Sequence, residues 1–354
     1  MKQFFSLLTA VILLFMFCTG CNTVKVTEPD STEKLSRYEG SFLDVFDTVT
    51  RIVVYAETEA TASAIVDNIH AQLLNHHQLF DIYNDYPGIH NLKTINDNAG
   101  IRPVKVDKQI LDLLDYAKKM YTFTGGKMNV ALGSVLQIWH NYREAGIDDP
   151  VNAALPPIAD LKAANAHTNI DHLIIDRDAS TVYLADPTMQ LDVGAIAKGY
   201  AAQLVIDKLR AEGVQHLLLS IGGNVCGIGL RGDGTPWKVG VQSPDMQSNL
   251  CTVALTNLNL VTSGSYQRYY TVNGQQYHHI IDPETLMPAD YFVSVSILCD
   301  DSGKADALST ALFNMPLSDG RTMIESLDGV EAMWTDQNGV ETFSSGFESL
   351  LIHD

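Results

Sequence analysis

Four short segments carry residue types that could bind an anionic ligand together with a metal ion. In the first, residues 191–200 (LDVGAIAKGY), a strand end delivers Asp192, a glycine opens a helix and Lys198 follows in its first turn. The free backbone N–H groups of a helix start favour anionic oxygens, and Lys198 adds a positive charge. This pattern indicates a phosphate site, although Asp192 as a helix cap and Lys198 as a surface lysine explain it equally well.

The second segment, residues 304–312 (KADALSTAL), places Asp306 and Thr310 four residues apart and so on one face of a helix. The neighbouring positions are apolar, and a carboxylate buried among them is costly without a partner. Carboxylate, hydroxyl and backbone carbonyl oxygens are ligands that suit Mg²⁺. We therefore favour a magnesium site over the alternative, in which Asp306 is a helix N-cap and Thr310 bonds back to its own helix.

The third segment is the glycine pair Gly222-Gly223, which follows an apolar strand. Two glycines at this position permit close approach of a ligand to the backbone. A tight turn or bulge is the commoner reason for such a pair, so this segment alone is weak. It is not a GxGxxG string, and a Rossmann fold is not inferred from it.

The fourth segment consists of residues 262–270 and 277–283, which flank an Asn-Gly turn and should pair as a hairpin. Pairing would bring Arg268 and His279 close together. Adjacent histidines on a strand point to opposite faces, so only one of His278 and His279 can face a site. No carboxylate spacing typical of zinc accompanies them, and a zinc site is disfavoured.

Hydrophobic patterning predicts the elements that position these segments. The expected strands are residues 42–55, 216–221, 237–241, 259–262 and 293–298, with a hairpin over 173–184 and turns at Asn273-Gly274 and Asn338-Gly339. The expected helices are residues 59–80, a helix capped by Asp107 and ending at Gly125-Gly126, residues 194–212 and residues 304–314, with a surface excursion over 148–169. Helices mixed with antiparallel hairpins predict an α/β (mixed α+β) fold in one domain.

Composition narrows the classes of function. The chain has 354 residues, of which 46% are hydrophobic and 18% charged, which is enough apolar material for a sizeable core. Its 23 basic and 42 acidic residues give a net charge of −19, which repels phosphate backbones and argues against a nucleic-acid-binding protein. No apolar run reaches the ~18–20 residues of a spanning helix, so a polytopic membrane protein is not expected.

The N-terminus is typical of an exported bacterial lipoprotein. Lys2 precedes the apolar residues 4–17, and Cys18-Thr19-Gly20-Cys21 then leads into polar residues. Small residues before Cys21 resemble a lipobox, whose cysteine is lipidated after cleavage; an ordinary signal peptide or an uncleaved anchor is the alternative. We predict a signal peptide over residues 1–20, a flexible tether from lipidated Cys21 over 21–38, and a folded domain over 39–354. The protein would then be anchored by lipid to the cell membrane on its extracytoplasmic face.

Three cysteines lie outside this leader: Cys226, Cys251 and Cys299. An odd number without CxxC spacing predicts neither a zinc site nor a disulfide framework. Each falls in an apolar, strand-like setting, so buried free thiols are expected.

Together, the four segments resemble the ApbE family, the FAD:protein FMN transferases. The similarity extends from about Phe46 to Asn314 and rests on the strings LDVGAIAKGYA, LLLSIGGNVCGIG, TSGSYQRYY, YHHIIDPETLMP and ADALSTALF, in the family's order and spacing. Any one of these strings is a weak signal, whereas five in order are specific. The resemblance implies that residues 39–354 form one ApbE-type domain with mixed sheets and flanking helices.

The resemblance also implies a site in which the diphosphate of FAD lies beside Mg²⁺. The metal would be held by the carbonyl of Ala195 and by Asp306 and Thr310, with Ser309 assisting. The residues expected to bind FAD are Phe46, Tyr83, Met128, Asn129, Asp192, Lys198, Gly222, Gly223, Arg268 and Ile280. Asn129 and Ala131 depart from the family's usual Asp and Thr in a loop that contacts FAD, which bears on FAD affinity.

The implied reaction is attack by a Thr or Ser hydroxyl of an acceptor protein on the FMN-side phosphorus of FAD, with release of AMP. Mg²⁺ would offset charge on the leaving phosphate. The predicted catalytic residues are Asp306, His279 and Lys198; His279 is the candidate proton acceptor because an unperturbed histidine titrates near ~6.5. The family's acceptors are subunits of Rnf-type complexes and of Na⁺-translocating NADH:quinone reductases in the membrane.

Three other functions fit parts of the pattern. A Mg²⁺-dependent FAD pyrophosphatase needs the same site, with water in place of the acceptor hydroxyl. A non-catalytic FAD-binding lipoprotein is left open by Asn129 and Ala131. A solute-binding lipoprotein would have two lobes and a hinge, against which the continuous spread of the motifs argues.

Overall fold

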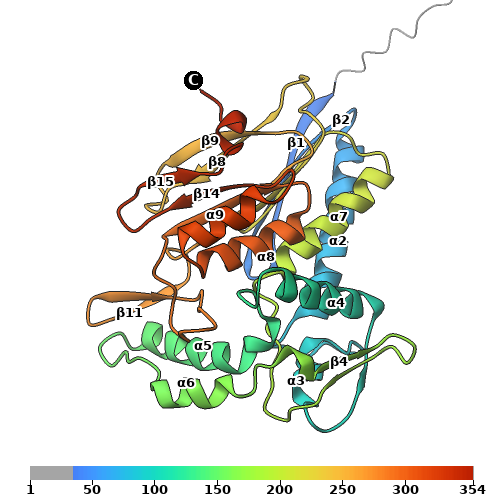
Figure 1. The fold of residues 1–354 in the computed structure, drawn as a ribbon. Helices are drawn as coiled ribbons and strands as arrows, with labels where there is room; N and C mark the ends of the chain where they lie inside the picture. Colours follow the sequence, from blue (N-terminus) through green and yellow to red (C-terminus); the bar gives the residue numbers. More distant parts are fainter. Residues whose placement is uncertain (1–34, 354) are drawn as a thin grey trace, which may run out of the picture. The chain divides into compact units, whose positions relative to one another are not determined.

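The structure is a computed structural model and describes residues 35–353. Its central element is an eight-stranded sheet (Figure 1). Its strands are β1 (Ser36–Val45), β2 (Thr48–Ala56), β6 (Leu217–Ile221), β7 (Asn224–Ile228), β10 (Asn259–Gly264), β13 (Ser294–Cys299), β14 (Glu331–Thr335) and β15 (Glu341–Phe343). They follow the order β1-β2-β6-β7-β10-β13-β14-β15, and each neighbouring pair is antiparallel.

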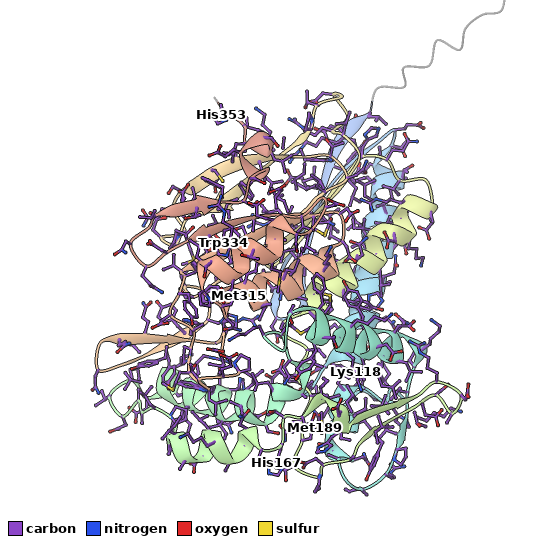
Figure 2. All side chains as sticks on the ribbon, in the orientation of Figure 1. Lys118, His167, Met189, Met315, Trp334 and His353 are labelled. Carbon is purple, nitrogen blue, oxygen red and sulfur yellow. The ribbon has the colours of Figure 1, made fainter. Side chains whose placement is uncertain are left out.

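Both faces of the central strands of this sheet are covered, whereas the edge strand β1 is largely exposed. One face is covered by α2 (Glu59–Phe80), α7 (Ala197–Ala211), α8 (Ser302–Phe313) and α9 (Leu317–Glu325). The other face carries the hairpin of β8 (Trp237–Gln242) and β9 (Asn249–Leu255) with the short helix η3 (Phe347–Leu350). Along β13, Ile297 packs on the helical side and Leu298 on the hairpin side, so the strand is apolar at successive positions. Trp334 of β14, labelled in Figure 2, is 1% exposed in the helical layer.

The remaining elements form a second region, which packs against α2, α7 and α8. Its helices are α3 (Leu92–Asp97), α4 (Lys108–Phe123), η1 (Val130–Leu132), α5 (Gly133–Asp148), α6 (Ile158–Asn165) and η2 (Ile170–His172). Its strands are β3 (Val104–Lys105), β4 (Leu173–Asp176) and β5 (Thr181–Leu184), in a sheet of order β3-β5-β4, and the hairpin of β11 (Tyr269–Val272) and β12 (Gln275–His278). Trp139, Leu161 and Tyr270 join α5, α6 and β11 in a small core of their own.

Most expectations about single elements are confirmed. The helix over residues 59–80 is α2, and Asp107 caps α4 by accepting a hydrogen bond from the Gln109 N–H. The 173–184 hairpin and the Asn273-Gly274 turn are present. All three cysteines outside the leader are free; Cys226 and Cys299 are fully buried as expected, whereas Cys251 is only partly buried. The mixed α+β class is confirmed as well.

Two expectations are wrong. Residues 42–55 are not one strand but the β1–β2 hairpin, because Phe46 and Asp47 adopt left-handed φ angles of 53° and 50°. The excursion over 148–169 contains α6, whose Leu161 is buried. The alternative considered for Asp306, a helix N-cap, is excluded as well, because Asp301 occupies that position and accepts from the Lys304 N–H.

The N-terminal predictions fall mostly outside the described residues. The signal peptide over 1–20 and the lipidation site Cys21 lie there entirely. The tether predicted to run to residue 38 overlaps β1, which begins at Ser36. Within residues 35–353, no helix has the length and apolar character needed to cross a membrane.

Candidate active site

A cleft of about 480 Å³ lies between the helical layer of the large sheet and the second region. Its volume falls in the range typical of small-molecule sites. Twelve of the fifteen predicted site residues line it: Phe46, Tyr83, Asn129, Asp192, Ala195, Lys198, Gly222, Arg268, His279, Ile280, Asp306 and Thr310. The fold therefore gathers residues from across the sequence at one place, while their individual roles stay predictions.

The other three residues are not on the cleft wall. Met128 is fully buried in the main core. Gly223 belongs to the β6–β7 turn, in which Gly222 is the residue that reaches the cleft. Ser309 is fully buried, and its hydroxyl is 2.7 Å from that of Ser263 and donates to the Asp306 carbonyl at 2.9 Å. These three residues therefore do not contribute to the proposed binding surface.

The segment that leads into α7 is held by side-chain bonds to the backbone. Asn96 pairs with Leu191 in both directions, accepting from its N–H at 2.8 Å and donating to its carbonyl at 3.0 Å. The Asp192 carboxylate accepts from the Gly194 N–H at 2.8 Å, and burial raises the pKa of Asp192. No side chain of the preceding residue, Ile196, caps α7, and the Ala197 N–H donates to the Val193 carbonyl at 2.8 Å. This leaves the N–H groups of Lys198 and Gly199 in the first turn for other acceptors.

One of these acceptors is Asp306, which reaches across from α8. Its Oδ2 accepts from the Gly199 N–H at 2.8 Å, and its Oδ1 is 3.9 Å from Lys198 Nζ. Asp306 is only 4% exposed, and burial raises its pKa, although Lys198 and the Gly199 N–H act in the opposite direction. Its charge is thus incompletely compensated by the protein, as expected for a carboxylate that binds a cation.

The donor set around Asp306 fits a magnesium ion. Thr310 lies one turn further along α8, and Ala195 lies just before α7; both line the cleft with Asp306. In the described part of the chain, no three His, Cys, Asp or Glu side chains cluster to hold a metal. A cation here would therefore depend on one carboxylate with hydroxyl and carbonyl oxygens, a set that suits a hard ion which keeps several waters.

Gly199 allows α7 and α8 to approach closely enough for these contacts. A Cβ at this position would lie 2.5 Å from the Asp306 Cβ, and closer still to the Ser302 carbonyl oxygen. Only a glycine leaves room for this crossing, because the obstructing atoms are largely backbone. The glycine thus positions Asp306 at the start of α7.

Two tight turns at adjacent strand ends form another wall. Phe46, in the β1–β2 turn, donates its N–H to His77 Nδ1 at 3.2 Å, and the two rings lie 5.7 Å apart. Gly222 has a φ of 46°, and a Cβ there would lie 2.8 Å from the Thr48 Cβ. The two turns pack so closely that a side chain at position 222 would collide with Thr48.

The β11–β12 hairpin brings Arg268 and His279 to the cleft, whereas His278 turns into the core. His278 is within hydrogen-bond distance of the Ala289 carbonyl at 2.8 Å. His279 Nδ1 is 3.2 Å from the Arg268 carbonyl, which can only accept, so Nδ1 carries the proton and Nε2 is free to accept one. Burial, and secondarily the nearby Arg268, lower the pKa of His279 to about 3. The expectation of an ordinary histidine pKa is therefore wrong.

The contribution of α5 to the cleft was not predicted from the sequence. His140 and Arg143 line the cleft, and their side chains are joined at 2.9 Å between Arg143 Nη2 and His140 Nδ1. The Tyr83 ring lies 5.3 Å from that of His140. Partial burial, with Asp192 nearby, raises the pKa of Tyr83 to about 12. Apolar periodicity over 133–148 was the available signal for this helix, but nothing local indicates which of its polar residues face a ligand.

Asn129 both lines the cleft and supports its loop. Its Oδ1 accepts from the Ala131 N–H at 2.9 Å, and its Nδ2 donates to the Thr168 carbonyl at 3.1 Å. Both the oxygen and the nitrogen of the side-chain amide are thus bonded to the protein backbone.

Comparison with known proteins gives a consistent result. Residues 46–334 match the ApbE family. The FAD:protein FMN transferase of Treponema pallidum (strain Nichols) is 33% identical over 307 residues, covering 82% of this chain and 82% of that protein. One from Klebsiella pneumoniae (strain 342) is 30% identical over 296 residues, covering 80% and 85%. The crystal structure of the ApbE protein from Thermotoga maritima has a TM-score of 0.79 at 27% identity, covering 90% of this chain and 100% of that chain. The flavin transferase ApbE from Vibrio cholerae has a TM-score of 0.75 at 25% identity, covering 90% and 100%.

Proposed function

The chain belongs to the ApbE family, and from this premise we propose that it is a Mg²⁺-dependent FAD:protein FMN transferase. A Thr or Ser hydroxyl of an acceptor protein attacks the FMN-side phosphorus of FAD. A bond forms between the acceptor oxygen and this phosphorus, and the bond from the phosphorus to the bridging oxygen breaks, releasing AMP. The observation that carries the proposal is the convergence of the α7 start, Lys198 and Asp306 in one cleft with Arg268 and His279.

The diphosphate of FAD is assigned to the start of α7. The backbone N–H of Lys198 and its Nζ supply positive potential there, and Arg268 supplies a guanidinium that suits phosphate oxygens. Such fixed charges are effective in phosphoryl transfer because positioning and electrostatics provide most of the acceleration.

Ala195, Asp306 and Thr310 would hold Mg²⁺ beside the diphosphate. This assignment is supported by the oxygen ligands that the three residues offer and by the Asp306 carboxylate, whose charge the protein compensates only in part. When bound, the metal neutralises charge that develops on the phosphate oxygens.

His279 orients the acceptor hydroxyl and accepts its proton at Nε2. With a pKa of about 3 in the free protein it is neutral and a weak base. Cations contribute to this low value, so an anionic diphosphate beside Arg268 and Lys198 would raise the pKa of His279 and strengthen it as a base. Phe46 and Tyr83 offer ring surfaces to the flavin or the adenine, and Gly222 lets the ligand approach the β6–β7 turn. Asn129, Asp192 and Ile280 complete the proposed FAD contacts.

The place of action is proposed from the leader. A lipid on Cys21 would hold the exported domain at the cell membrane, where acceptor subunits of Rnf-type or Na⁺-translocating NADH:quinone reductase complexes are within reach. Tethering raises the effective concentration of enzyme near such partners.

Mass spectrometry of an acceptor subunit after incubation with the full-length protein, FAD and Mg²⁺ tests the reaction. A mass gain of one FMN on a Thr or Ser, with AMP released, is expected, and the D306A variant should give none. Rapid multiple turnover of FAD to FMN and AMP without acceptor would instead favour a pyrophosphatase. Stoichiometric FAD binding without AMP in any condition would favour a binding lipoprotein.

A further inference from the structure

A continuous chain of hydrogen bonds joins Phe46 to Tyr83, two aromatic residues of the cleft. The Phe46 N–H donates to His77 Nδ1 at 3.2 Å, and His77 Nε2 is 3.2 Å from the Tyr86 hydroxyl. That hydroxyl donates to Asp81 Oδ2 at 2.7 Å, and Asp81 Oδ1 accepts from the Tyr83 N–H at 2.6 Å. All of these residues line the cleft except Tyr86.

The direction of every bond in this chain is fixed. A backbone N–H can only donate, so His77 Nδ1 is the unprotonated nitrogen that accepts from Phe46. In the neutral ring Nε2 then carries the proton and donates it to the Tyr86 oxygen. Burial, and next its bond to Asp81, raise the pKa of Tyr86, so its hydroxyl keeps the hydrogen that it donates to Asp81. The chain therefore requires one state of His77, neutral and protonated at Nε2.

At one end, the chain stabilises a backbone conformation that is unfavourable for residues with a side chain. Phe46 and Asp47 have left-handed φ angles of 53° and 50°. Within residues 35–353, the bond to His77 is the one side-chain hydrogen bond that the backbone of these two residues makes. The Phe46 ring also meets the His77 ring edge-on, with centroids 5.7 Å and planes 76° apart. His77 thus contacts both the backbone and the ring of Phe46.

At the other end, Asp81 organises the turn that carries Tyr83. Asp81 directly follows α2 and is 8% exposed. Its carboxylate accepts from the N–H groups of Tyr83 and Asn84, from the Asn84 side chain and from the Tyr86 hydroxyl. Burial acts to raise the pKa of Asp81, but these bonds outweigh it and the pKa is lowered, so the carboxylate stays charged. Tyr83 is 48% exposed, so its place depends on this backbone turn more than on core packing.

We propose that His77 is a positioning residue for FAD, which ties the Phe46 turn and the Tyr83 turn into one unit before the ligand binds. The inference rests on the proposed function, in which these two rings contact the flavin or the adenine. Preorganised contacts raise affinity because fewer groups must be ordered on binding. The chain does not include Lys198 or Asp306, which belong to α7 and α8. Its loss should therefore weaken FAD binding and leave the transfer rate at saturating FAD unchanged.

Two substitutions at position 77 separate the two bonds of the ring. In H77Q the longer amide reaches the place of Nε2 and can donate to Tyr86, but the Phe46 N–H loses its acceptor. In H77N the amide oxygen stands near the place of Nδ1 and can accept from Phe46, but the link to Tyr86 is lost. Y86F breaks that same link from the other side, at a residue outside the cleft lining.

The test is calorimetric titration of the full-length proteins with FAD in the presence of Mg²⁺. We expect H77Q to bind FAD about tenfold more weakly than the wild type, the upper end for one hydrogen bond. H77N and Y86F should each lose about two- to threefold, the lower end of that range. The double variant H77N/Y86F should lose no more than either single variant, because both remove one link. FMN transfer at saturating FAD should equal that of the wild type in all four.

The matched control is H70Q. His70 lies two turns earlier on α2 and also bonds to β1, through Asp44 at 2.9 Å, but it does not line the cleft. Its FAD affinity should equal that of the wild type. A loss in H70Q as large as in H77Q would overturn the proposal, since it would show that loosening α2 is enough.

Three other results would also overturn it: wild-type FAD affinity in H77Q, a loss in H77N equal to that in H77Q, or wild-type affinity in Y86F. The Y86F result keeps the test decisive if H77Q does not fold. The titrations need no acceptor, so they remain separate from the transfer assay, in which absence of FMN transfer by the wild type refutes the proposed function instead.

Discussion

The substitution G199A tests whether the close crossing of α7 and α8 positions the Asp306 carboxylate. An alanine Cβ would lie 2.5 Å from the Asp306 Cβ. Carbon atoms at optimal contact are ~3.5 Å apart or more, so the helices must separate by about 1 Å at this point. The Ser302 carbonyl oxygen, which is backbone, obstructs the same position and cannot rotate away.

The energetic effect follows from two opposing terms. Alanine is favoured over glycine inside a helix by about 1 kcal/mol. Overpacking costs about 1–3 kcal/mol, and the rigid backbone atom places this site at the upper end. We therefore expect a net destabilisation of about 1–2 kcal/mol. Activity should fall much further, by roughly a hundredfold, because a displacement of about 1 Å moves Asp306 relative to Ala195 and the start of α7.

The assays are thermal denaturation and FMN transfer to an acceptor, with G320A as the matched control. Gly320 lies in α9, where the nearest atom to a new Cβ is the tip of the Leu312 side chain at 3.1 Å. This control should be as stable as the wild type or more stable, with full transfer activity. Wild-type stability and transfer in G199A would refute the idea that this crossing fixes the site.

Two further predictions concern titratable groups in the cleft. The D306N variant keeps the hydrogen bond from the Gly199 N–H but loses the buried charge. FMN transfer should therefore be abolished. The metal-free variant should nevertheless be more stable than the wild type at neutral pH. Burial raises the pKa of Asp306 above its ordinary 3.8, so its contribution to stability is present below that value and lost as pH rises through the folded pKa. Urea denaturation should show the advantage of D306N growing above about pH 4, by about 1.4 kcal/mol for each unit of the shift; an advantage that shrinks with pH would contradict this. For His279, a pKa of about 3 predicts no step near ~6.5 in the pH profile of kcat/KM. A step there that disappears in H279Q would show that the histidine titrates normally.

Elements with strong local signals were predictable, and those set by tertiary contacts were not. Residues 59–80 have helical periodicity and a capping threonine, and α2 matches them. The β1–β2 turn has no glycine or asparagine, and its left-handed Phe46 and Asp47 give no turn signal in the sequence. Their conformation is stabilised from a distance, by the bond of the Phe46 N–H to His77 and by the contact of Thr48 with Gly222.

The same distinction applies to the site. Motifs on α7 and α8 identified Lys198 and Asp306, since their chemistry is visible in residue type and spacing. The low pKa of His279 depends on burial and on Arg268, neither of which the sequence displays. Likewise, Arg143 lines the cleft only because α5 packs beside it. Met128 instead points into the main core, as Val130 does, and not toward the cleft.

Several local costs to stability lie at this cleft. Phe46 and Asp47 hold backbone conformations that cost about 1–3 kcal/mol each in residues other than glycine. Asp192 and Asp306 are carboxylates whose pKa values burial raises, and Asn314 leaves an amide oxygen unpaired. Elsewhere in the described chain the helices and the sheet bury apolar side chains against one another, and this burial offsets the free-energy cost of these features. A cation bound together with an anionic ligand would compensate the two buried carboxylates, and Lys198 would contact the ligand's oxygens. These neighbouring features together argue for a binding site more strongly than any one of them does.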